Sequence, residues 1–452
     1  MRLPLALSLA LVAAACLRAE APPIRGTLPE DLLPGLGPLL SKAVERSPST
    51  ISASIALASA EASDYGSAAA LWPHLSANTS YLVSDESISR GTTSTAKGFN
   101  YGLNISQPIF QWGAYRNQKL VGDLNVKIAE KQFADAYRML AVTIREQYLG
   151  LIEKRIALRN AQFTLKISQE SLQAQQARFE AGSSSEAELG NFRMSVEEAQ
   201  LDTDRAEEDF RYAKRVFTRL VGVDDLADDS IPLELPHPEY SAGLADTVLT
   251  GFVGEGIEST FQSEVYKMLL RQQDLNYKIA AVGLLPKVNA AAGYTYSNQT
   301  SVSQTSISQV GVQQESYSVA AGWTIFDGFA TRGAKLSALA NKRLFERQRQ
   351  TYIDSTIDQI SDLRKQLGFS SRAMSIAEVH NALIAAEVKR LGQDKELGYA
   401  SQATIDTGVL NLYATEFNMV YARSEYLGRW TEFVSMAGID PALENLSSRY
   451  AR

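Results

Sequence analysis

Four short segments of the chain alternate between apolar and polar residues, and this pattern limits the fold more than any other feature. The segments cover about residues 72–84, 98–109, 287–298 and 315–326. The second, for example, reads FNYGLNIS from Phe99 to Ser106. A period of two, with one apolar face and one face of small polar residues, is typical of strands in a membrane barrel.

Four strands are too few to close such a barrel, because the smallest closed barrels have about eight. An open sheet edge is not tolerated in lipid, so the pattern predicts a barrel shared between subunits. A soluble sheet is the alternative, but Tyr, Phe and Trp on one face and Ser, Asn and Gly on the other suit lipid and water better. The polar stretches at 85–98 and 298–315 predict long exposed loops.

The N-terminus indicates export. Arg2 precedes an apolar run from Leu3 to Ala15, which predicts a signal peptide over residues 1–19. Cleavage after Ala19 and lipoprotein processing before Cys16, the only cysteine, are the two alternatives. No later run reaches the roughly 18 apolar residues of a membrane helix, so we expect insertion through strands. The net charge of −7, without a basic stripe, argues against nucleic acid as a partner.

The chain repeats itself once. YGLNISQPIF at 101–110 matches YSVAAGWTIF at 317–326, and each half reads helix, two strands, long helix, glycine turn, helix. The halves cover residues 38–221 and 256–438. The other parts are an extended N-terminal segment, a connecting segment packed outside the helices and a C-terminal tail, at 20–37, 222–255 and 439–452.

Two very long helices dominate the pattern, at about 115–180 and 331–396. Each would be about 100 Å long at about 1.5 Å per residue. Apolar residues recur at spacings of three and four, so each helix needs neighbours along its whole length. Shorter helices before the strands and after the turns are the natural neighbours, stacked end to end. A solitary coiled-coil stalk is the alternative, but the mixed period and high alanine content favour a curved wall of many helices.

Two glycines end the long helices, and acidic residues lie nearby. Gly182 and Gly398 suit the left-handed conformation with which a helix turns back. Glu188, Asp394 and Asp406 flank these turns, and in a threefold assembly each would form a ring that selects cations. The alternative is that they complement helix dipoles, each by at most about 1 kcal/mol.

The search for catalytic chemistry finds no candidate. His74, His237 and His380 have no metal-ligand spacing, and the Asp224–Asp229 run lacks the glycine and spacing of a calcium loop. The sequence therefore predicts no enzyme, no metal and no cofactor.

Three motifs, in this order, carry a family resemblance: SQPIFQWG at 106–113, RFEAGSSSEAEL at 178–189 and TIFDGF at 324–329. With the internal duplication, the chain resembles the TolC family of outer-membrane efflux factors over about residues 38–438. The resemblance implies a mixed α and β membrane protein. It would be a homotrimer in which four strands per chain form a shared 12-stranded barrel in outer-membrane lipid, continued by a helical barrel in the periplasm.

The resemblance also implies partners and site residues. An inner-membrane pump and a periplasmic adaptor would meet the helical tips, which here are Gly182, Ser183, Gly398 and Tyr399. Asp406, Asp394 and Glu188 would form the pore gate or selectivity site, and Cys16 the lipidation site. The chain departs from the family near the second turn. Ala400 and Ser401 replace an arginine that is common there, and Asp406 alone represents the usual two aspartates.

These observations predict a passive exit duct of a tripartite efflux or type I secretion system. A non-conducting structural or adhesive spacer is one alternative, but it would favour large apolar residues on the inward strand faces. A periplasmic enzyme or binding module is another, disfavoured by the lack of a clustered polar site. The sequence does not identify the cargo.

Overall fold

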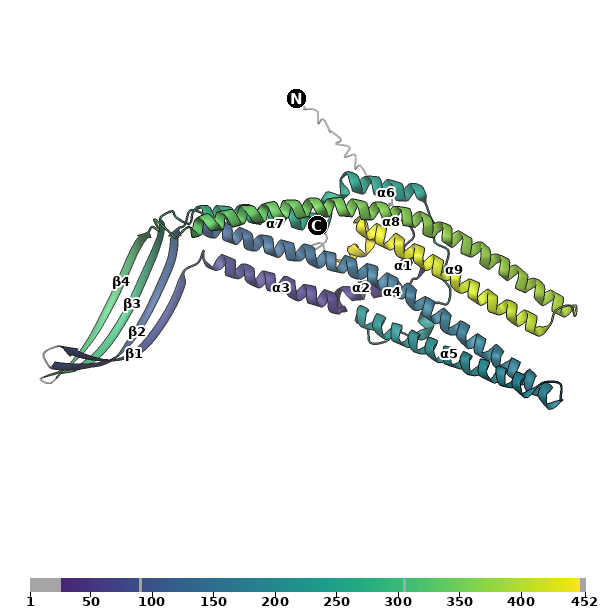
Figure 1. Cartoon of the computed structure of the whole chain (residues 1–452). Coiled ribbons are helices and arrows are strands. Elements are labelled where there is room, and N and C mark those ends of the chain that lie inside the picture. The colour runs from purple at the N-terminus through teal and green to yellow at the C-terminus, as the bar shows by residue number, and fades with distance from the viewer. Residues whose placement is uncertain (1–25, 89–91, 304–305, 448–452) are drawn as a thin grey trace, which may run out of the picture.

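The computed structural model describes residues 26–88, 92–303 and 306–447. The molecule is elongated, with a sheet at one end and long helices that run from it to two helical tips at the other (Figure 1). The expected signal peptide and Cys16 lie outside the described residues.

The sheet has four antiparallel strands in the order β1–β2–β3–β4. The strands are β1 His74–Ile88, β2 Thr92–Phe110, β3 Lys287–Ser303 and β4 Ile307–Gly322. β2 of the first repeat pairs with β3 of the second, so one sheet joins the two repeats. Within the chain, β1 and β4 are edge strands.

The strands continue through most of the segments predicted to be loops, so those predictions are wrong. Asp85 pairs with Thr95, and Gln299 pairs with Val310. The alternating segments nearer the helices set the register of the strands. The Thr- and Ser-rich stretches that follow them extend the same hydrogen-bonded ladders. β4 ends at Gly322, earlier than expected, and the indole N–H of Trp323 donates to the Leu284 carbonyl at 2.9 Å.

The helices form a wall in which four helices lie side by side at each level. The long helices are α4 Ala114–Glu180 and α8 Ala330–Glu396, and their shorter neighbours are α3 Pro48–Ala69, α5 Glu186–Val221, α7 Phe261–Ala281 and α9 Gln402–Met436. Near the sheet the order of packing is α3, α4, α7, α8, and near the tips it is α5, α4, α9, α8 (Figure 1). One side of the wall therefore ends in α3 and α5, and the other in α8.

The N-terminal segment is not extended where it is described, which corrects the prediction. α1 covers Pro29–Leu32 and α2 covers Leu36–Arg46, and both Leu28 and Leu36 are fully buried. The leucines of this segment recur at helical spacings, so helix formation buries them. A new helix, α3, begins at Pro48, because a helix tolerates proline only in its first turn.

A buried ion cluster fixes both ends of the described chain to the middle of α4. The Arg145 guanidinium is fully buried and donates to both carboxylate oxygens of Asp440, at 2.6 and 2.8 Å. It also donates to both oxygens of Glu30, at 2.6 and 2.9 Å. Asp440 precedes the short helix η3 (Pro441–Asn445) and accepts from the Ala442 N–H at 2.9 Å. All charges of the cluster are thus hydrogen-bonded.

The connecting segment packs against the wall near its middle. It contains η1 Asp228–Ser230 and α6 Ala242–Gly254, and α6 lies on α8 (Figure 1). The short helix η2 Gly256–Ser259 follows it and leads into α7. Glu378 of α8 accepts from His237 of this segment at 2.7 Å and from Arg423 of α9 at 2.6 and 2.7 Å. Burial opposes ionisation of Glu378, yet these two partners hold its pKa below the usual value.

This pKa shift predicts a pH dependence of stability. A carboxyl whose pKa is lowered in the folded state stabilises the protein above its unfolded pKa, and this contribution is lost as the pH falls through the folded pKa. From about pH 6 to about pH 3.5, the urea midpoint should therefore fall further for the native chain than for Glu378→Gln. Other carboxylates titrate in both proteins, so equal losses would show that this contact adds no stability.

Candidate functional site: the sheet faces and the helical tips

The strand register joins the alternating segments into one apolar face across β1, β2 and β3, which on β4 extends to Tyr317, where Glu315 follows in the row of Leu103. Leu103 lies between Ala77 and Tyr294, and the neighbouring row contains Leu75, Ile105, Ala292 and Tyr317. No other part of the described chain packs over these rows, since Leu103 is 52% exposed and Tyr317 is 80% exposed. A large exposed apolar surface of this kind marks contact with lipid or with another protein.

Aromatic side chains gather at both ends of the apolar face. Away from the helices, Tyr81, Phe99, Tyr101 and Tyr296 form a chain of ring contacts with centroids 4.6, 6.3 and 6.2 Å apart. Near the helices, the ring pairs are Phe110 with Trp112 at 4.8 Å and Phe326 with Phe329 at 5.3 Å. Aromatic belts at two levels are typical of barrel strands that cross both membrane–water interfaces.

The strands are longer than a membrane requires. They contain 15 to 19 residues, whereas a tilted membrane strand needs about 9–11. On the same face, Glu315 of β4 pairs with Tyr294, and further charges follow just beyond the outer aromatic chain, where Lys97 pairs with Val83 and Asp85 comes two residues later. Strands that extend beyond the apolar band and carry charges at their outer ends are typical of barrels whose strand ends project from the membrane.

The opposite, polar face is made of small residues that pack closely. Asn104 lies between Ser76 and Gly293 in one row of this face. A Cβ added to Gly293 would come within 2.9 Å of the Ser316 hydroxyl, and one added to Gly102 would clash with Asn78. Glycine makes room where the side chains of one face converge, so the polar face suits the inner, concave side of a barrel.

The first tip lies between α4 and α5. Gly182 has a φ of 73°, and the Ser183 N–H donates to the Arg178 carbonyl at 2.9 Å, as in a Schellman motif. Ser185 then begins α5 with a capping box, in which its hydroxyl accepts from the Glu188 N–H and its N–H donates to the Glu188 carboxylate.

The second tip, between α8 and α9, repeats this geometry. Gly398 has a φ of 80°, and the Tyr399 N–H donates to the Asp394 carbonyl at 2.7 Å. Ser401 caps α9 by accepting from the Thr404 N–H at 3.1 Å. Both turns are thus set by glycine and a capping serine, and Tyr399 is 83% exposed at the end of the molecule.

The three acidic residues near the tips differ in their surroundings. Hydrogen bonds from Ser184 and from the Ser185 N–H hold the pKa of Glu188 below its usual value, so this carboxylate is engaged in capping. Asp394 pairs with Arg390 at 3.3 Å. Asp406 accepts from the Gln402 amide at 2.6 Å and, within the described part of the chain, has no cationic partner. Of the three carboxylates, that of Asp406 has neither an ionic partner nor a capping contact among the described residues.

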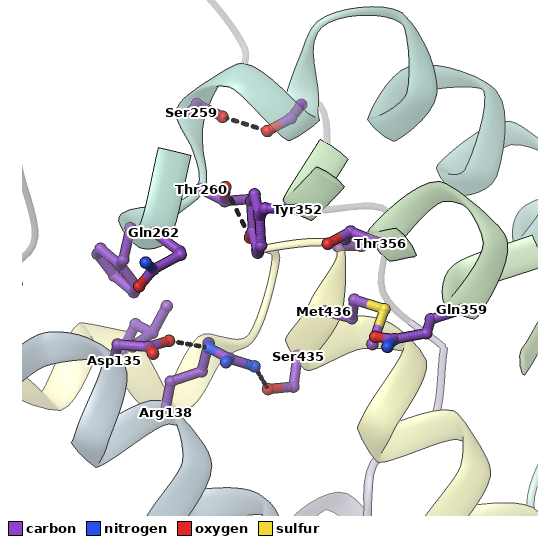
Figure 2. Close-up of a pocket in the computed structure, with 15 residues that line it drawn as sticks. Asp135, Arg138, Ser259, Thr260, Gln262, Tyr352, Thr356, Gln359, Ser435 and Met436 are labelled. Carbon is purple, nitrogen blue, oxygen red and sulfur yellow. Dashed lines mark hydrogen bonds and ion pairs between the residues drawn. The ribbon is translucent and has the colours of Figure 1, made fainter. Parts of the chain in front are cut away.

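A separate pocket of about 350 Å³ lies at the middle of the wall, where α4, α7, α8 and α9 meet (Figure 2). Its polar groups bind one another: Arg138 donates to Asp135 at 2.8 Å and to Ser435 at 3.0 Å, and the Tyr352 hydroxyl donates to Thr260 at 3.1 Å. These contacts join α4 to α9, and α8 to the residue that caps α7.

Two searches of the described residues bear on other functions. No group of three or more His, Cys, Asp and Glu side chains there is placed to hold a metal ion. Among the helices of the same residues, none is both long enough and apolar enough to cross a membrane.

Comparison with known proteins identifies the architecture. Residues 39–223 match the outer membrane efflux protein family. The structure is similar to the Campylobacter jejuni CmeC outer membrane channel, with 15% identity, a TM-score of 0.69 and coverage of 99% of this chain and 98% of CmeC. The open state of the Neisseria gonorrhoeae MtrE outer membrane channel also matches, with 15% identity, a TM-score of 0.66 and coverage of 89% and 88%. A search of curated proteins found no significant match.

The expected fold class is confirmed, since one chain supplies four strands and a long helical body, as in the trimeric outer-membrane efflux channels. These relatives are channels rather than enzymes. The first repeat thus matches the outer membrane efflux protein family, and the whole chain has the fold of TolC-like channels, which lie in the outer membrane and extend into the periplasm.

Proposed function

We propose that three copies of the chain form a passive exit duct, which passes substrates from a periplasmic adaptor and an inner-membrane pump to the exterior. The observation that supports it best is the sheet, which has a lipid-type apolar face and two unpaired edges, β1 and β4. Backbone groups on an open edge are not tolerated in lipid. If β4 of one copy pairs with β1 of the next, the backbone N–H and C=O groups of both edges are hydrogen-bonded.

Three sheets of four strands close a barrel of twelve strands, which is larger than the smallest closed barrels of about eight. Its inner surface would be the polar face, with Asn, Ser and Gly in place of a packed core. Such a lumen holds water. A non-conducting spacer would have no use for a polar inner face, so the conducting duct is favoured.

At the other end of the molecule, we propose the two tips as the surface that meets the adaptor. Gly182 and Ser183 form one turn, and Gly398 and Tyr399 form the other. Leu397 and Tyr399 are 68% and 83% exposed, which gives the second tip an apolar surface for a partner. In a threefold assembly, Asp406 would stand just above this turn as a ring of charge at the pore entrance.

Replacing either tip glycine with valine should abolish export while leaving trimer formation intact. A non-glycine residue in the left-handed conformation costs about 1–2 kcal/mol, and a β-branched one more, so the turn rearranges. Export of a pump substrate from cells would be compared for Gly182→Val, Gly398→Val and the control Gly392→Ala. Gly392 lies within α8, where an added Cβ meets nothing within 4 Å. Normal export by both tip variants would refute the tip assignment.

A further inference from the structure

The pocket at the middle of the wall lies in the joint between two helices that are stacked end to end (Figure 2). α9 ends at Met436 and α7 begins at Phe261, and α4 and α8 run past both helix ends. The pocket of about 350 Å³ is the space that these two ends leave between the long helices. Small-molecule sites in proteins have volumes of about 300–1,000 Å³, so the joint has room for a ligand.

The first repeat contains the same joint, between α5 and α3, but there it is filled. Gly222 follows α5 with a φ of 78°, and Gly438 follows α9 with a φ of 74°. A Cβ added to Gly222 would come within 2.2 Å of the Arg46 carbonyl oxygen of α2, whereas one added to Gly438 meets nothing within 4 Å. The eleven-residue α2 precedes α3, but only the four-residue η2 precedes α7. The second joint stays open because the helix that precedes it is short.

Besides the bonded Arg138 and Tyr352, three polar side chains line the pocket without a hydrogen-bond partner among the described residues, namely Gln262, Thr356 and Gln359. Thr356 is only 5% exposed. Buried polar groups are nearly always hydrogen-bonded, since an unbonded one has lost water without replacing it. Figure 2 shows the three side chains around the same space as Arg138, where a ligand would meet all of them.

The rest of the lining favours a neutral ligand with an apolar body. Of the lining residues, only Asp135 and Arg138 are charged, and Arg138 donates to Asp135 at 2.8 Å, which balances the two charges. Phe261, Met436 and Leu443 provide an apolar surface. A charged ligand would lose its hydration without gaining an unpaired opposite charge, which is costly. A ring-containing molecule with an uncharged hydrogen-bonding group fits these residues.

The pocket continues onto one side of the wall. It shares four lining residues with a groove of about 450 Å³, which runs along α4 past Met139 and Glu146. Tyr137 of α4 faces the other side, because its hydroxyl donates to the Leu40 carbonyl of α2 at 3.1 Å. Met139 and Glu146 lie two and nine residues beyond it, or about 200° and 180° around the helix. In the proposed duct, the side that α2 does not cover faces the lumen.

We propose that the joint binds a neutral, ring-containing amphiphile, with its polar group on Thr356 and its rings against Phe261 and Met436. The inference rests on the proposed duct and adds to it a binding site for solutes of this class, midway along the wall. Water would satisfy the polar groups but not the apolar surface, so an amphiphile fits the whole lining better.

Two fluorescent probes with one skeleton test the site: the neutral N-phenyl-1-naphthylamine and its anionic relative 8-anilinonaphthalene-1-sulfonate. Each is titrated into the purified mature protein in amphipol, with protein-free amphipol as the blank. The neutral probe should bind saturably, at one site per chain, and more tightly than the sulfonate. Thr356→Val removes the hydroxyl and should weaken binding of the neutral probe about two- to tenfold, the usual effect of one neutral hydrogen bond.

Two further variants are the controls. Thr356→Ser keeps the hydroxyl and should bind the neutral probe as the native chain does. Thr415→Val removes another buried hydroxyl, which bonds Asn381 at 3.1 Å outside the pocket, and should leave binding unchanged. Equal weakening by Thr356→Val and Thr415→Val would overturn the site, because the effect would then come from lost stability.

Native mass in mild detergent, measured on the same samples, separates the remaining outcomes. Saturable binding that Thr356→Val weakens and Thr356→Ser retains would support the site. No saturable binding, or equal binding by Thr356→Val and the native chain, would mean that the joint holds only water. That result would overturn the site, and a mass of three chains would leave the duct standing. A mass of one chain would overturn the duct, and with it the role of the site for solutes in the lumen.

Discussion

Replacing Arg145 with methionine is expected to lower the free energy of unfolding by about 3–5 kcal/mol, the usual effect of removing one partner from a buried ion pair. Water would not solvate the Asp440 carboxylate, because its side chain is fully buried, and Glu30 is only 16% exposed. Both would then be buried charges without a cation. Urea unfolding of the mature protein in mild detergent, followed by far-ultraviolet circular dichroism, measures the loss.

The chain offers a matched control ten residues further along α4. Arg155 pairs with Asp229 at 3.6 Å, but that carboxylate is fully exposed, so Arg155→Met should change stability by less than about 1 kcal/mol. Adding Glu30→Gln and Asp440→Asn to Arg145→Met should restore part of the loss, because the uncompensated charges are then gone. Equal effects of the Arg145 and Arg155 substitutions would refute the role of the cluster.

Arginine on the apolar face of the sheet should prevent stable insertion, whereas arginine one residue further along should not. Leu103 lies on the apolar face and Asn104 on the polar face, in the same strand. On the lipid side of a barrel, Arg costs about 2–4 kcal/mol at the midplane, and a trimer bears that cost three times. Leu103→Arg should therefore be depleted from outer-membrane fractions, while Asn104→Arg should accumulate normally.

The polar-face variant has a second expected result. Three added positive charges in the lumen should shift the conductance of purified protein in planar bilayers toward anions. The opposite pattern, with Leu103→Arg inserted normally and Asn104→Arg lost, would mean that the sheet faces are reversed.

The sequence predicts the fold where local pattern and final environment agree. The strands around Phe99 and Tyr294 show a period of two because one face meets lipid, and the long helices show spacings of three and four because each packs along its length. The strand extensions were missed because Thr- and Ser-rich segments resemble loops, and only pairing with a neighbour makes them strands.

Other features depend on contacts that no local pattern encodes. Arg145 binds Glu30 and Asp440, which are 115 and 295 residues away in the chain. For Glu188, the spacing from Ser185 is that of a capping box, and this signal was available in the sequence.

The most direct test of the account is the native mass of the mature protein extracted from membranes in mild detergent and corrected for bound detergent. The shared barrel predicts a mass of three chains, because four strands with two open edges do not close a pore. A stable single-chain particle would contradict the shared barrel, and the proposed duct would fail with it.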